Sequence, residues 1–145
     1  MMTRKFMEGY FDHFNNARFG KVARYFADDM ELRYFRRWTT GPQEPLVVIK
    51  GRDGFLSNYE YMNGIFDEKI RLLGFAANEG SLFVDIRTSW VAKKDTDIMV
   101  IGPLRKGEMF CVNHFINYTL DLNGKFMLIR VAQFRTIDPN EATVR

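Results

Sequence analysis

Two long runs near the C-terminus constrain the fold most. Residues 109–120 and 126–134 are rich in β-branched and aromatic side chains, and Asp121-Leu-Asn-Gly124 separates them. An Asn-Gly pair is common in tight hairpin turns because these turns need positive φ angles. The pattern therefore predicts two adjacent antiparallel strands.

The first of these strands divides its side chains between two faces, because side chains alternate across a sheet. One face is mostly apolar and also holds an imidazole and a phenol: Phe110, Val112, His114, Ile116, Tyr118 and Leu120. The other face carries Cys111, Asn113, Phe115, Asn117 and Thr119. Apolar walls with a few polar groups are typical of small-molecule pockets. We therefore expect the first face to line a cavity.

The rest of the chain predicts three helices and further strands. Thr3 is the expected N-cap of a first helix, whose apolar residues run from Phe6 to Phe14 at helical spacing. A short second helix is expected from Phe19 to Phe26, stopping near Asp28-Asp29, and a third from Gly51 to about Asn63. Strands are expected at residues 30–34, 46–49, 69–77 and 81–92. This order predicts an α+β fold in which three helices cover one face of a strongly curved, mostly antiparallel sheet.

A chain of 145 residues predicts one domain, spanning residues 1–145. Residues 1–4 and 136–145 are expected to be flexible ends. Residues 93–107 are polar at both ends around the apolar run Ile98-Met-Val-Ile101, which fits either an extra edge strand or a lid.

Composition excludes several classes of protein. No apolar run is long enough to span a membrane, and the N-terminus lacks the apolar core of a signal peptide. The single Cys111 can form no internal disulfide, so we expect a reducing, cytoplasmic location.

The charged and ligand-forming residues also favour no macromolecular or metal partner. The net charge of +3 is mild, and Arg33, Arg36 and Arg37 fit a solvated face better than a nucleic-acid site. Two His and one Cys without close spacing cannot build a zinc site without several carboxylates, and no phosphate-binding glycine loop is present. We therefore expect no metal and no cofactor.

Three segments carry a family resemblance: Tyr10 to Leu32, Lys50-Gly-Arg-Asp53 and Asp121 to Phe126. They resemble the NTF2-like superfamily, and within it the SnoaL-like polyketide cyclases and ketosteroid isomerases, and the resemblance spans about Phe6 to Phe134. It implies a conical, cystatin-like half-barrel with a deep cavity, often a homodimer through the outer face of the sheet. The superfamily includes isomerases, cyclases, dehydratases and non-enzymatic modules, so the resemblance is specific for fold rather than for function.

The same resemblance bears on the site. Tyr10 falls where ketosteroid isomerases place the phenol that donates to the substrate oxyanion. Tyr34 and Ile116 occupy the positions of their two acids, so the isomerase carboxylate pair is absent.

His114 is then the expected base, because an imidazole exchanges protons near neutral pH. The alternative is a buried, neutral histidine whose ring is hydrogen-bonded to a backbone carbonyl or to Tyr118. Tyr10 is the expected oxyanion donor. The expected substrate-binding residues are Tyr34, Tyr118, Phe14, Ile116, Trp90 and Val112. His13 is expected on the helix surface, with the mouth of the cavity as the alternative, because it lies one helical turn from Tyr10. Asp85 and Arg87 are expected to form a solvent or dimer-interface pair; if the strand is out of register, they instead face the cavity as the missing carboxylate and an anion clamp. Cys111 is expected in a packing role on the outer face.

These observations predict a small, cofactor-independent isomerase, cyclase or dehydratase. Its substrate would be a bulky hydrophobic carbonyl compound, such as a polyketide or terpenoid intermediate of secondary metabolism, processed by acid–base chemistry through an enolate. The alternative is a non-catalytic NTF2-like module that binds a hydrophobic ligand or a partner protein. Expected partners are a hydrophobic small molecule and a second copy of the chain, without nucleic acid or membrane.

Overall fold

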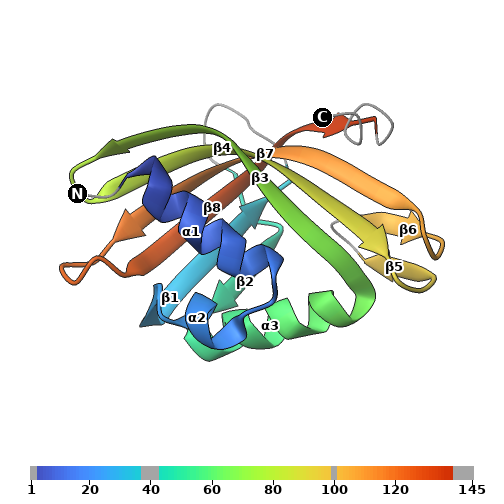
Figure 1. Cartoon of the computed structure of the whole chain (residues 1–145), viewed down its shortest axis with the longest axis horizontal. Coiled ribbons are helices and arrows are strands. Elements are labelled where there is room, and N and C mark those ends of the chain that lie inside the picture. Colours follow the sequence, from blue (N-terminus) through green and yellow to red (C-terminus); the bar gives the residue numbers. More distant parts are fainter. Residues whose placement is uncertain (1–2, 37–42, 99–100, 139–145) are drawn as a thin grey trace.

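Three helices lie against one side of a strongly curved sheet, whose long strands arch over them in Figure 1. The computed structural model describes residues 3–36, 43–98 and 101–138. The helices are α1 (Arg4–Asn15), α2 (Phe19–Ala23) and α3 (Arg52–Ile65). The main sheet consists of β1 (Phe26–Phe35), β2 (Val47–Lys50), β3 (Phe66–Asn78), β4 (Ser81–Ala92), β7 (Met109–Leu120) and β8 (Phe126–Ile137). A separate hairpin pairs β5 (Thr96–Ile98) with β6 (Gly102–Leu104).

The main sheet has the order β2-β1-β8-β7-β4-β3. Its neighbouring strands are antiparallel except for β1 and β8, which run parallel. The expected α+β class and mostly antiparallel curved sheet are therefore confirmed. Among the described residues, no helix is both long and apolar enough to cross a membrane.

The predicted hairpin of β7 and β8 forms, but Asp121 holds its turn. The Asp121 carboxylate accepts hydrogen bonds from the backbone N–H groups of Asn123 and Lys125, at 2.8 and 2.9 Å. Gly124 has a φ of 75°, whereas Asn123 does not adopt the left-handed conformation. Only one residue of the Asn-Gly pair therefore supplies the positive φ.

The second helix is shorter than its periodicity predicts. It ends at Ala23, and Phe26 begins β1 instead of closing the helix. The reason is strand pairing: Phe26 lies beside Phe126 of β8, and the Phe126 backbone N–H donates to the Tyr25 carbonyl at 2.7 Å. Asp28-Asp29 therefore lies within a strand rather than at a helix end.

Strands β3 and β8, like β1, extend beyond their predicted ends. Strand β3 begins at Phe66, three positions before the expected start at residue 69. Strand β8 continues past Phe134 to Ile137, which pairs with Cys111 and is 2% exposed. Of the expected flexible ends, residues 136–137 are part of the sheet, Thr3 caps α1, and Arg4 is the first residue of that helix. The remaining parts, residues 1–2 and 139–145, lie outside the described residues, as do Arg37 and residues 99–100.

Side chains fill the space between helices and sheet in two clusters. The larger cluster is rich in aromatic rings from α1, α3, β1, β7 and β8, and β4 adds aliphatic side chains to it. The smaller cluster lies under the β5–β6 hairpin and contains Ile65, Phe66, Trp90, Ala92 and Val112. Between them the packing leaves the cavity described next.

Candidate active site

A cavity of about 290 Å³ lies between the helices and the inward face of the sheet. Apolar side chains make up most of its wall, as the alternation in β7 predicted. Its polar or hydrogen-bonding side chains come from the helices α1 and α3 and from the strands β1, β3, β4 and β7. They are Tyr10, Tyr34, Asn58, Tyr59, Tyr61, Glu68, Thr88, Trp90, His114 and Tyr118. Ile98 and Ile101 of the β5–β6 hairpin also line it, so this hairpin forms part of the cavity wall rather than an extra edge of the main sheet.

Glu68 is the only ionisable carboxylate among the described residues that line this cavity. It lies on β3 in the inward series Phe66, Glu68, Ile70, and it pairs in register with Trp90 of β4. The described lining contains neither lysine nor arginine. Glu68 is therefore a carboxylate in an apolar cavity without a neighbouring cation.

Burial raises the pKa of Glu68 from 4.5 to about 7. Desolvation disfavours a charged carboxylate, and the described lining of the cavity holds no lysine or arginine to offset this effect. The nearby Trp90 indole N–H acts in the opposite direction and lowers the pKa of Glu68. Among the described residues, however, this N–H makes no hydrogen bond of normal geometry. Glu68 is thus able to gain and lose a proton near neutral pH.

The charge of Glu68 affects the pKa values of three tyrosines. Burial raises the pKa values of Tyr10, Tyr34 and Tyr59, and the Glu68 carboxylate raises each of them further. A phenol with a raised pKa stays protonated and remains a hydrogen-bond donor. The cavity therefore combines one titrating carboxyl group with several protonated phenols.

His114 is held on both sides of its ring. Its Nε2 atom lies 2.9 Å from the Tyr34 hydroxyl, and its Nδ1 atom lies 3.0 Å from Thr88 Oγ1. Burial lowers the pKa of His114 to about 3, so the ring is neutral at physiological pH. One ring nitrogen then donates and the other accepts. The Tyr34 hydroxyl also lies 3.4 Å from Gln133 Oε1.

Most of the site residues predicted from the sequence meet in this cavity. It is lined by Tyr10, Phe14, Tyr34, Trp90, His114, Ile116 and Tyr118. Val112 also points inward, but it is fully buried in the smaller cluster and does not line the cavity. The reason is its position under the β5–β6 hairpin, where Trp90 and Phe110 pack beside it.

The other candidates lie outside the cavity. His13 is half-buried on α1, with its Nδ1 atom 3.0 Å from an Arg18 nitrogen. Asp85 and Arg87 occupy the outer face of β4, where the Asp85 carboxylate accepts a hydrogen bond from the Asn113 amide at 3.3 Å. Cys111 is buried, and this burial raises the pKa of its thiol.

The sequence analysis missed Glu68. The predicted strand began at residue 69, which left Glu68 in the preceding loop. A signal was available in the alternation of Phe66, Glu68, Ile70 and Leu72, because an acid in an otherwise apolar series points toward the core. Because Asp67 and Lys69 on either side are also charged, the three residues together have the composition of a loop.

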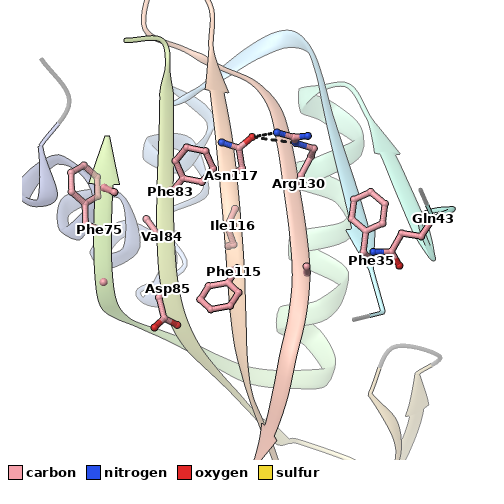
Figure 2. A pocket seen from close by; sticks show the side chains of 13 residues that line it. Phe35, Gln43, Phe75, Phe83, Val84, Asp85, Phe115, Ile116, Asn117 and Arg130 are labelled. Carbon is pink, nitrogen blue, oxygen red and sulfur yellow. Dashed lines mark hydrogen bonds between the residues drawn. The ribbon is translucent and has the colours of Figure 1, made fainter. Parts of the chain in front are cut away.

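A second hollow, of about 720 Å³, lies on the opposite face of the sheet (Figure 2). Figure 2 shows Phe83 and Phe115 beside it, with the helices behind the sheet. The Arg130 Nε–H donates to Asn117 Oδ1 at 3.1 Å on one side of the hollow. Phe83 and Phe134 are 48% and 52% exposed, so this face presents aromatic surface to its surroundings.

A scan of protein-family models and a search of curated proteins gave no match. Among solved structures, an NTF2-like protein from Exiguobacterium sp. 255-15 has a TM-score of 0.64 at 15% identity, over 88% of this chain and 96% of that one. A candidate polyketide cyclase from Xanthomonas campestris has a TM-score of 0.62 at 18% identity, over 95% and 91%.

A third similar structure is SalBIII, an epoxide hydrolase/cyclase-like enzyme of pyran ring formation in the polyether salinomycin. Its TM-score is 0.62 at 16% identity, over 88% of this chain and 86% of that one. These likenesses show that the chain has the NTF2-like fold, which confirms the resemblance seen in its sequence. At such identities they establish the fold and not the reaction.

Proposed function

We propose that the protein is a small acid–base enzyme that acts on a hydrophobic carbonyl compound by isomerisation, cyclisation or dehydration. The observation that carries this proposal is Glu68, a carboxyl group with a pKa of about 7 in an apolar cavity. A general base or acid is most effective when its pKa lies near the working pH. The cyclase and the epoxide hydrolase/cyclase-like enzyme among the similar structures support a catalytic use of such a cavity.

In this proposal Glu68 carries the proton. Its carboxylate takes a proton from the carbon next to the substrate carbonyl, and the electron pair of the broken C–H bond moves into an enolate. The protonated Glu68 then returns the proton to another carbon, or gives it to a departing hydroxyl group that leaves as water. Tyr10, whose phenol stays protonated, donates a hydrogen bond to the enolate oxygen.

For His114 we propose a different role from the base expected from the sequence. With a pKa of about 3 it accepts a proton poorly at neutral pH, and both ring nitrogens already have neighbours at hydrogen-bonding distance. We propose that His114 and Thr88 position the Tyr34 hydroxyl as a second donor toward the substrate. The role of Tyr10 as the oxyanion donor stays a prediction.

Hydrogen–deuterium exchange tests this proposal without knowledge of the natural product. The protein is incubated in deuterated water with a panel of hydrophobic ketones, and deuterium incorporation next to the carbonyl is followed by mass spectrometry. Enhanced exchange for at least one class of ketone is expected. Binding without enhanced exchange across the panel would instead favour the non-catalytic module.

The proposal includes a cytoplasmic homodimer joined through the outer face of the sheet. The aromatic hollow on that face, with exposed Phe83 and Phe134, supports an interface because a second copy would cover this apolar surface. Light scattering after size-exclusion chromatography is expected to give twice the mass of one chain, and Phe83→Glu to shift the mass toward one. A monomeric wild-type protein would contradict this part of the proposal.

A further inference from the structure

We propose that the inner cavity also binds a small organic cation, a substituted ammonium compound, with Glu68 as its counter-ion and the surrounding aromatic rings as its walls. This inference goes beyond the proposed function, because it concerns the charge that the cavity selects and does not depend on turnover.

The first argument is the unbalanced charge of Glu68. No described salt bridge includes it, and no lysine or arginine is among the described lining residues. Burying an anion without a counter-ion is unfavourable, so the binding free energy of a positively charged ligand is more favourable there than that of a neutral one. A ligand that brings a negative charge is repelled.

The second argument is the aromatic lining. Tyr34 and Tyr59 lie close enough to Glu68 for its charge to raise the pKa of each phenol, and Trp90 is its partner across the strands. Phe14 stacks on Tyr59 with ring centroids 4.4 Å apart. Aromatic faces attract substituted ammonium groups, and they provide apolar contacts for the alkyl substituents that a carboxylate alone does not.

The third argument is size and access. A cavity of about 290 Å³ accommodates a compact ammonium compound, and the aromatic Tyr61 is 59% exposed while still lining the cavity. Tyr61 therefore places one ring at the mouth of the cavity, where a ligand enters from solvent.

Isothermal titration calorimetry with choline and its neutral isostere 3,3-dimethylbutan-1-ol tests the inference. The two probes have nearly the same shape and differ in charge. We expect choline to bind at least about tenfold more tightly than the neutral alcohol, as a desolvated cation–π site with a counter-ion implies. Equal affinities, or no choline binding at millimolar concentrations, would overturn the inference.

Two variants locate the binding. Glu68→Gln removes the charge at constant size and is expected to abolish the preference for choline, whereas Glu60→Gln, on the exposed side of α3, is expected to keep it. Tyr61→Ala is expected to weaken choline binding severalfold without unfolding the protein, because its ring is largely exposed. Choline binding that survives Glu68→Gln unchanged would show that the cation does not use this cavity.

The pH dependence adds a further check. Choline has a constant charge, so its binding is expected to strengthen between about pH 6 and 8 as Glu68 loses its proton. Five buried groups described in the cavity keep their charge over this range, because burial raises the pKa values of the phenols and lowers that of the imidazole: Tyr10, Tyr34, Tyr59, Tyr118 and His114. If the wild-type protein binds choline but does not accelerate deuterium exchange in any ketone, the proposed function is contradicted and the cation site is not.

Discussion

Glu68→Gln is expected to slow the exchange of deuterium next to a ketone by about 10²- to 10⁴-fold, the usual contribution of a positioned general base. Glutamine has nearly the same shape as glutamate but cannot accept the proton. The apolar cavity around Glu68 holds no other carboxylate among the described residues to replace it. The measurement is the initial rate of deuterium incorporation for the ketone that responds best to the wild-type protein.

Glu60→Gln is the matched control for this variant, because it makes the same chemical change on an exposed helix surface. It is expected to keep the wild-type rate. His114→Gln provides a second comparison: if His114 only positions Tyr34, its loss should lower the rate less than the loss of Glu68 does. A Glu68→Gln protein that exchanges deuterium at the wild-type rate would remove Glu68 from the mechanism.

The same substitution is expected to stabilise the folded protein above neutral pH. The native Glu68 carboxyl has a pKa of about 7, against 4.5 for an unperturbed group, so the native state holds a proton between these values that the unfolded state has released. The free energy of unfolding therefore falls as pH rises through this window. The difference of pKa corresponds to a loss of about 3 kcal/mol once both states are ionised.

Glutamine carries no charge in either state, so Glu68→Gln escapes this loss. Denaturant unfolding at about pH 4.5 and pH 8 is expected to show a gain of about 2–3 kcal/mol for the variant at the higher pH, relative to its difference at the lower one. Because Glu68 is partly exposed, solvent weakens the desolvation of its carboxylate, and we expect a gain near the smaller value. An unchanged difference between the two pH values would indicate that Glu68 ionises freely in the native protein.

Much of the fold follows from local patterns in the sequence. The alternation in residues 109–120 assigned His114, Ile116 and Tyr118 to one face, and this face does line the cavity. The expected N-cap Thr3 accepts a hydrogen bond from the Phe6 backbone N–H at 3.2 Å. Such features depend on neighbours within a few residues, which a sequence shows directly.

The chemistry of the site depends on contacts that are distant in sequence. The ring of His114 is fixed by Thr88 and Tyr34, which are 26 and 80 positions away. The surroundings of His114 therefore depend on the packing of three strands, which local sequence patterns do not show. The same is true of Glu68, whose inward position follows from its register with Trp90.

The error in the second helix has a similar origin. Phe19, Val22, Ala23 and Phe26 have helical spacing, but Phe26 is buried by pairing with Phe126, a hundred residues later in the chain. Periodicity identifies which side chains are buried. It does not identify the element that buries them when a distant strand competes for the same residue.

The pKa of Glu68 is the most direct test of this account, because the proposed reaction depends on it, and so does the predicted pH dependence of cation binding. A ¹³C NMR titration of the side-chain carboxyl groups, assigned by comparison with the Glu68→Gln protein, measures this pKa without any substrate. We expect one resonance, absent from the variant, to titrate with a midpoint of about 7. A midpoint near 4.5, the value of an unperturbed glutamate, would contradict the account.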